Sequence, residues 1–175
     1  MPDPDSRQNQ QNPYSHLRPP ENSCKVDNDS PYGARLLVQR AFKRGDLILP
    51  LVGRHAAPSY KTIQIGLNTH LEGSLTAFIN HSCRPSAIIM TQEIAIRAWT
   101  DLEAGDEVTF FYPSTEWAMV RPFNCLCGAP DCIGYVAGAK YLPLSLLSRH
   151  PVSPHIRQLA GDVLASFSYA STPPR

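Results

Sequence analysis

Short apolar runs, separated by turn residues, dominate the middle of the chain. The runs that we expect to form strands are residues 35–40, 47–52, 62–65, 87–90, 93–98 and 107–112. Strands of this length, spaced by glycine and aspartate, are typical of small antiparallel sheets. The pattern therefore predicts a mostly β protein made of small twisted sheets rather than a parallel α/β core.

Two local patterns refine this picture. The same turn chemistry occurs twice, at 42–46 and 102–106, each time ending in Gly-Asp before a strand. The runs 87–90 and 93–98 are close enough to form a hairpin. A short helix is expected over 75–79, leading into Asn80.

The C-terminal part has helical periodicity instead. Ser153-Pro154 is typical of an N-cap followed by the first helical position. Apolar residues then follow at helical spacing: Ile156, Leu159, Ala160, Val163, Leu164 and Phe167. This predicts an amphipathic helix that packs on the domain, and a helix that binds a partner has the same pattern.

Composition narrows the class of protein. Residues 1–22 are rich in Pro, Asn, Gln and Ser, so we expect a disordered arm before a single domain. With 16 Lys and Arg against 15 Asp and Glu, no basic field exists to attract nucleic acid or a membrane surface. No apolar run approaches the roughly 20 residues that span a bilayer. We expect an intracellular protein; neither its compartment, nucleus or cytoplasm, nor its oligomeric state follows from the sequence.

The cysteines suggest a metal site. Cys125, Cys127 and Cys132 lie within eight positions, among glycines that let the backbone wrap around an ion. Structural zinc prefers four ligands, so one is missing from this cluster. Cys24 and Cys83 are the cysteines left to supply it, and His81 also has the right chemistry. Buried free thiols or a disulfide remain the alternatives.

Four motifs, in one order, resemble the SET-domain family, the fold of most protein lysine methyltransferases. Residues 80–85, Asn-His-Ser-Cys-Arg-Pro, resemble its signature, and residues 105–112 resemble its Gly-Glu-Glu-Leu-Thr-x-Asp-Tyr strand. The Cys-x-Cys-Gly-x3-Cys-x-Gly run at 125–134 resembles its post-SET zinc motif. Gly33-Ala34-Arg35 resembles its opening Gly-x-Gly. Together these motifs cover roughly residues 30–138.

The resemblance implies a fold and a reaction. The chain around Asn80 would thread under a surface loop and build a pocket for S-adenosylmethionine. The implied divisions are a SET domain at 23–117, a post-SET zinc segment at 118–138 and a helical extension at 139–170. The implied activity is methyl transfer to a protein or peptide lysine. No direct binding of nucleic acid or of a membrane is expected.

Particular residues inherit roles by this resemblance. Tyr112 matches the catalytic tyrosine, and Cys83 matches the fourth zinc ligand beside Cys125, Cys127 and Cys132. The residues that match the cofactor site are Gly33, Ala34, Arg35, Asn80, His81, Phe123 and Leu126.

Departures from the family pattern lie mainly around the substrate. Ala77 and Phe111 stand where the family usually has Arg and Asp, Ser86 stands for Asn, and Arg35 for Gly. The insert between Val52 and Ala77 is short, which suggests an open or differently shaped substrate side. Two other functions therefore remain: an enzyme of a biosynthetic pathway with a repurposed pocket for a small molecule, and a non-catalytic binding module.

Overall fold

The structure, a computed structural model, describes residues 22–31 and 33–161. The expected arm falls outside these ranges apart from Asn22, and so do Val163, Leu164 and Phe167. None of the helices within the described ranges has the length and apolar character needed to cross a membrane.

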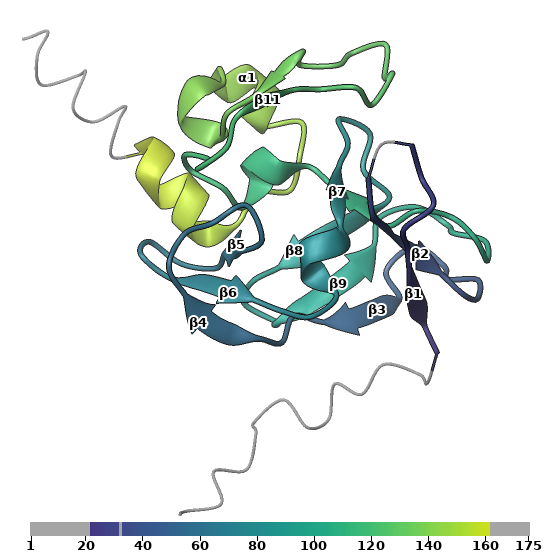
Figure 1. Ribbon diagram of the computed structural model, residues 1–175. Helices are drawn as coiled ribbons and strands as arrows, with labels where there is room; N and C mark the ends of the chain where they lie inside the picture. Colours follow the sequence, from purple (N-terminus) through teal and green to yellow (C-terminus); the bar gives the residue numbers. More distant parts are fainter. Residues whose placement is uncertain (1–21, 32, 162–175) are drawn as a thin grey trace, which may run out of the picture.

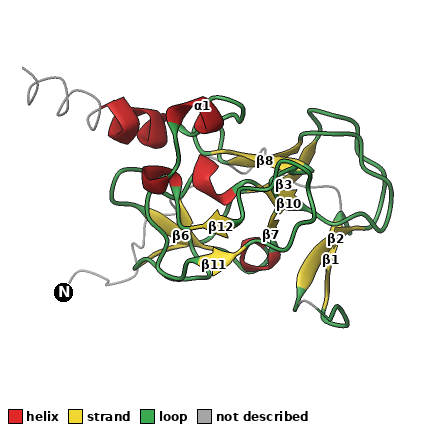
Figure 2. Ribbon diagram, turned by 90° about the horizontal axis from the view of Figure 1, so that it is seen from above, coloured by secondary structure: helices red, strands yellow, loops and turns green. Residues whose placement is uncertain are grey.

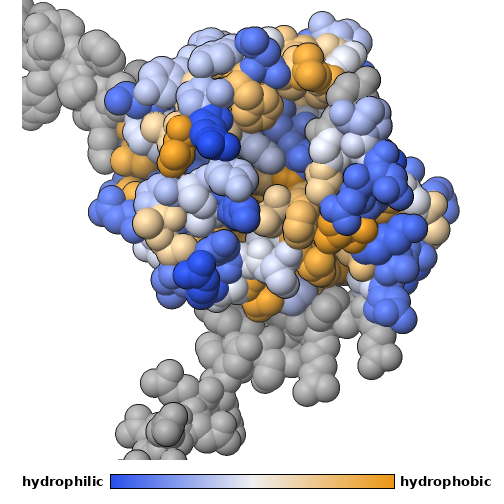
Figure 3. All heavy atoms as spheres, viewed as in Figure 1, coloured by the Kyte–Doolittle hydropathy of each residue, from blue (hydrophilic) through white to orange (hydrophobic). Residues whose placement is uncertain are grey.

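Small sheets make up most of the fold, as the sequence predicts (Figure 1). The antiparallel hairpin of β1 (Cys24–Asp27) and β2 (Arg35–Val38) lies at one side. One three-stranded sheet has the order β3 (Leu47–Pro50), β9 (Ala95–Ala98) and β8 (Ala87–Met90). Another has the order β4 (Arg54–Ala56), β6 (His70–Glu72) and β5 (Ile63–Gln64). Apolar side chains appear in separate groups on the face drawn in Figure 3.

Two distant segments run side by side at the centre. β7 (Asn80–His81) pairs in parallel with β10 (Thr109–Phe110), and the two strands lie beside each other in Figure 2. The 3-10 helix η1 (Thr76–Phe78) leads into β7, close to the expected helix at 75–79. This pairing places the Asn-His motif against the strand that leads, through Phe111, into Tyr112.

The two similar turns pack against each other. Phe42 and Leu102 form a β-bridge, with backbone hydrogen bonds in both directions. In each turn an aspartate accepts a backbone N–H three residues earlier, Asp46 from Lys43 and Asp106 from Glu103, both at 2.8 Å. The matching turn chemistry therefore serves one paired structure, whose Phe42 and Leu102 belong to the main core.

The C-terminal half builds a second, smaller core. It contains β11 (Phe123–Asn124), β12 (Tyr135–Val136) and α1 (Leu144–Leu147), together with the 3-10 helices η2 (Tyr112–Ser114) and η3 (Ala139–Tyr141). Residues 154–161 are helical, and fully buried Ile156 packs in a cluster with Phe111, Ala139 and Leu147. The described part of the C-terminal helix thus packs on the domain.

The helix begins where the sequence predicts, but its expected cap is not formed. The backbone carbonyl of Ser153 accepts the N–H groups of Ile156 and Arg157. The Ser153 hydroxyl is buried and has no hydrogen-bond partner. Packing of Ile156, rather than side-chain capping, therefore fixes the start of the helix.

The hairpin at 87–98 is confirmed, since β8 and β9 pair antiparallel, from Ala87 opposite Ala98 to Met90 opposite Ala95. The other expected runs contain strands that are shorter by two to four residues. The sequence pattern missed β1, β4, β6, β7, β11 and β12. Most of these have only two or three residues, too few for an alternating pattern, and their pairing depends on distant partners.

Candidate functional site

Four cysteines converge where the central strands meet the C-terminal half. The sulfur atoms of Cys83, Cys125, Cys127 and Cys132 all lie within 4.8 Å of one another. The Sγ of Cys83 is 3.9 Å from the Sγ of Cys125 and 3.9 Å from that of Cys132. A tetrahedron with Zn–S bonds of about 2.3 Å requires S–S distances of about 3.8 Å. The donor set and its spacing therefore fit one zinc ion.

The surroundings of the sulfurs also fit bound thiolates. The N–H of Ile133 points to Cys83 Sγ at 3.5 Å, and the N–H of Gly134 points to Cys132 Sγ at 3.4 Å. Such donors stabilise negative sulfur and orient a ligand. Cys24 lies elsewhere, in β1, and burial raises the pKa of its thiol to about 11. The structure thus groups Cys83, not Cys24, with the cysteine cluster.

His81 joins this cluster to Tyr112. Its Nδ1 accepts the backbone N–H of Tyr112 at 3.2 Å, so the proton lies on Nε2. Nε2 is 3.4 Å from Cys83 Sγ and is placed to donate to it. Burial, with a contribution from the charge of His150, lowers the pKa of His81 to about 4. The ring is therefore neutral at physiological pH and acts as a rigid spacer.

Asn80 is held from two sides. Its Nδ2 donates to the carbonyl of Ala34 at 3.2 Å and to Oε1 of Glu107 at 2.9 Å. A Cβ added at Gly33, whose φ is +102°, would meet no atom within 4 Å, so open space borders this backbone. Ala34 and Asn80 are thus brought together, and the neighbouring Gly33 is exposed.

The other residues of the expected cofactor site lie in different parts of the structure. Phe123 lies with its ring centroid 6.0 Å from those of His81 and Tyr112, edge to face with both. Arg35 instead forms an ion pair with Asp27 at 2.7 Å across the β1–β2 hairpin. Leu126 is 81% exposed at the outer surface of the cysteine loop. The structure therefore groups Phe123 with the centre and leaves Arg35 and Leu126 at the periphery.

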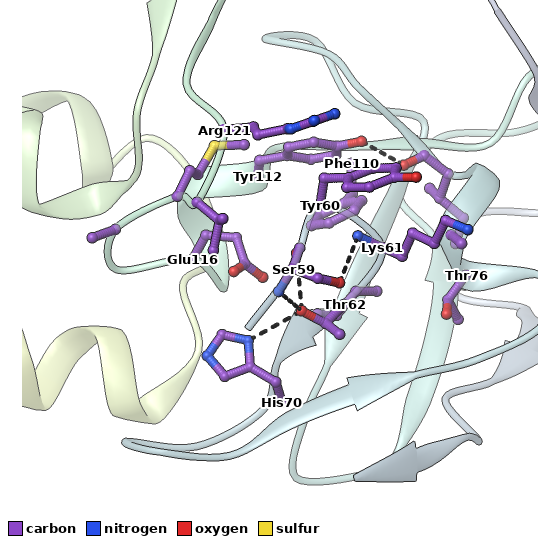
Figure 4. Close-up of a pocket in the computed structure, with 16 residues that line it drawn as sticks. Ser59, Tyr60, Lys61, Thr62, His70, Thr76, Phe110, Tyr112, Glu116 and Arg121 are labelled. Carbon is purple, nitrogen blue, oxygen red and sulfur yellow. Dashed lines mark hydrogen bonds between the residues drawn. The ribbon is translucent and has the colours of Figure 1, made fainter. Parts of the chain in front are cut away.

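Tyr112 forms one wall of a cavity. Its hydroxyl donates to the carbonyl of Ile79 at 2.9 Å, which fixes the ring, and burial raises the pKa of the phenol well above its usual range. The cavity has a volume of about 40 Å³ and is bordered by Phe110, Ala77 and Tyr60 among others (Figure 4). A space this small admits only the end of a substrate.

Glu116 lies deep in the same cavity and was not found from the sequence. Its Oε1 accepts the N–H of Gln64 at 2.7 Å and the hydroxyl of Thr115 at 3.1 Å. Burial raises the pKa of this carboxyl to about 7, against the lowering effect of these two bonds. A lone acid after an aromatic strand carries no spacing signal, and only the fold directs it toward Tyr112.

Two departures from the family pattern have structural roles. Phe111 is 2% exposed and its ring stacks on that of His150, with centroids 3.8 Å apart, so it anchors the C-terminal extension. The Ser86 hydroxyl donates to the Glu107 carbonyl at 2.7 Å and accepts the N–H of Thr109 at 2.9 Å. Trp117, which follows η2, packs against the second core.

Comparisons with known proteins agree with this arrangement. The family model described as SET domain matches residues 4–113. The protein named Methyltransferase flvH, from Aspergillus flavus, is 39% identical over 159 residues, which cover 87% of this chain and 89% of the relative. A histone-lysine N-methyltransferase of Schizosaccharomyces pombe, H3 lysine-4 specific, is 41% identical over 71 residues, 37% of this chain. Those residues span only 8% of that relative.

Solved structures show the same fold at low identity. The crystal structure of KRYPTONITE in complex with mCHG DNA and SAH has a TM-score of 0.55 at 17% identity, over 69% of this chain and 30% of the other. The methyltransferase domain of human SETMAR has a TM-score of 0.52 at 16% identity, over 66% and 58% of the two chains.

Proposed function

This chain belongs to the SET-domain family, and from that premise we propose that it is an S-adenosylmethionine-dependent methyltransferase that methylates a lysine-type amine. The observation that carries the proposal is the position of Tyr112. It lies between the Asn80–His81 strand, at the expected cofactor side, and a cavity that admits only the end of a substrate. The two reactants would therefore meet at this side chain.

The residue types fit amine methylation. When bound, S-adenosylmethionine supplies an electrophilic methyl group on a sulfonium. The acceptor must be a neutral amine, whereas on the order of one in 10³ lysine side chains is neutral at pH 7. The aromatic walls at Phe110, Tyr112 and Tyr60 lower the pKa of an entering ammonium by desolvation. The Tyr112 hydroxyl donates its proton to the carbonyl of Ile79, and the lone pairs of its oxygen remain available to orient the amine.

The proposed zinc ion has a structural role here. Four protein sulfurs leave it no open position, so it is not expected to activate a substrate. By fixing Cys83, the zinc would help to hold His81, which in turn accepts the backbone N–H of Tyr112. We propose Ala34, Asn80, His81 and Phe123 as cofactor contacts, with Leu126 as the outer edge of the lid. Gly33 and Arg35 complete the site that the motif match assigns.

We propose two kinds of substrate that could bear the acceptor amine. A lysine of a protein or peptide is supported by the histone-lysine N-methyltransferases among the relatives. A small molecule is supported by the positive charges of Lys61 and Arg121 at the mouth of the cavity, which can bind an acidic group close to the amine. A purely binding role does not explain why a tyrosine is held against a cavity that admits only the end of a substrate.

Labelled S-adenosylmethionine, with peptides and small amines as acceptors, tests methyl transfer. We expect Tyr112→Phe to lower kcat by about 10²-fold or more, since the variant loses the oxygen that orients the amine. Tyr141→Phe, whose ring is 62% exposed, is the matched control and should keep full activity. Equal rates for wild type and Tyr112→Phe on every acceptor would contradict the role of Tyr112, and no methyl transfer to any acceptor would contradict the proposed activity.

A further inference from the structure

The mouth of the cavity carries positive charge. Tyr60 is 64% exposed, and both cations lie over its ring: Lys61 Nζ 5.6 Å and Arg121 Cζ 4.8 Å from the centroid. Contact with an aromatic face holds a cation without neutralising it. Within residues 22–31 and 33–161, neither side chain forms an ion pair with a carboxylate. We call Lys61 and Arg121, with Tyr60 between them, the cationic rim.

The interior of the same cavity holds an acid whose pKa of about 7 leaves it partly ionised at neutral pH. Glu116 is the one acid among the lining residues, and Figure 4 shows its carboxyl group at the far end of the cavity from Arg121. Burial lowers the pKa of His70, so this neighbouring ring adds no charge at neutral pH.

This separation of charge selects a kind of substrate. An ammonium group gains from approaching Glu116 and Tyr112, while the cationic rim favours an anion and repels a second cation. A substrate with a positive end and a negative group a few bonds away matches both regions. A lysine in a segment rich in Arg and Lys matches only the interior.

We propose that the acceptor amine belongs to a molecule with a nearby carboxylate, which binds Lys61 and Arg121 while the ammonium end enters the cavity toward Glu116 and Tyr112. The carboxylate belongs either to a small amino acid or to acidic residues that flank a lysine in a peptide. The methylation of such a substrate rests on the proposed function above. The charge preference in binding does not.

A matched pair of ligands tests the charge preference. Nα-acetyl-lysine carries a carboxylate, and its carboxamide differs only by the loss of that charge. Binding of each is measured by calorimetry to the full chain saturated with S-adenosylhomocysteine. The peptide arm compares a lysine between two aspartates with the same peptide carrying asparagines. We expect the anionic member of at least one pair to bind about 5- to 10-fold more tightly at low salt, and less so at about 0.5 M salt.

Variants connect this preference to the rim. The double variant Lys61→Gln/Arg121→Gln should remove the difference between the paired ligands while binding the uncharged member as wild type does. Lys140→Gln is the control, because Lys140 also lies over a tyrosine ring, at 5.9 Å from the Tyr141 centroid, but lies outside the cavity lining. Glu116→Gln should weaken both members of a pair equally, since both carry the ammonium.

The outcomes separate the two proposals. The inference is overturned if both members of both pairs bind equally, if the uncharged members bind more tightly, or if no ligand binds. It is also overturned if the double variant keeps the preference of the wild type. A preference for the anionic ligand without any methyl transfer would uphold the inference and count against the proposed function. Methyl transfer with the same kcat/KM for both members of each pair would support the proposed function and count against the inference. Whichever pair shows the preference identifies the source of the carboxylate.

Discussion

Glu116 shows how burial changes one side chain. Its pKa is raised to about 7 in the folded protein, mainly because burial disfavours the carboxylate, from an ordinary value of 4.5. Between these two values the folded protein keeps a proton that the unfolded chain releases. The free energy of unfolding must therefore fall as the pH rises through this window, and the contribution is lost once the pH passes about 7.

Glu116→Gln should remove this dependence, because the amide oxygen still accepts from Gln64 and Thr115 but does not titrate. We expect the stability of the variant relative to wild type to rise by up to about 3 kcal/mol between pH 4.5 and 7.5. Urea unfolding across this range measures it. The titrations of His70 and His155 do not depend on Glu116, so they are common to both proteins and cancel. A difference that stays constant with pH would contradict the raised pKa.

At the scale of elements, Gly138 controls how β12 passes into η3. Its φ is +112°, and an added Cβ would lie 2.5 Å from the carbonyl oxygen of Trp117. Gly138→Ala should therefore destabilise the protein by at least about 2 kcal/mol, seen as a lower midpoint of thermal or urea unfolding. Gly161→Ala is the control: its Cβ would meet nothing, and a helical alanine should stabilise by up to about 1 kcal/mol. A neutral Gly138→Ala would show that this backbone rearranges freely.

The C-terminal helix offers a second test at this scale. Ile156 is fully buried beside Phe111, whereas the neighbouring Arg157 is exposed. Ile156→Ala should cost about 2–4 kcal/mol through lost contacts and the cavity it leaves. Arg157→Ala should change stability by less than about 0.5 kcal/mol. If both variants unfold like wild type in urea, the helix does not contribute to the stability of the domain.

At the scale of the whole molecule, the cysteine cluster joins Cys83 in the centre to the loop at 125–132. Chelation of the proposed zinc should lower the thermal midpoint and make the segment 118–138 sensitive to proteases, because metal binding and folding are coupled. Metal analysis should find about one zinc per chain, reduced strongly in Cys132→Ser. Cys24→Ser is the matched control and should keep its zinc. Equal zinc loss in both variants would contradict the assignment of the four ligands.

The sequence by itself determined what depends on neighbours along the chain. The spacing of Cys125, Cys127 and Cys132 and the paired Gly-Asp turns are local patterns, and so is the hairpin at 87–98. The order of the motifs was enough to indicate the family. The cysteine spacing alone did not decide between Cys24 and Cys83 as the fourth zinc ligand, and the family resemblance then favoured Cys83.

Only the tertiary structure decided what depends on distant partners. It directed Glu116 into the cavity beside Tyr112, and stacked Phe111 on His150. It also placed Arg121 and Lys61, 60 positions apart in the sequence, over the ring of Tyr60. No periodicity records such contacts, because they arise when separate elements pack together and exclude water, and a side chain's charge and pKa then depend on what the fold places around it.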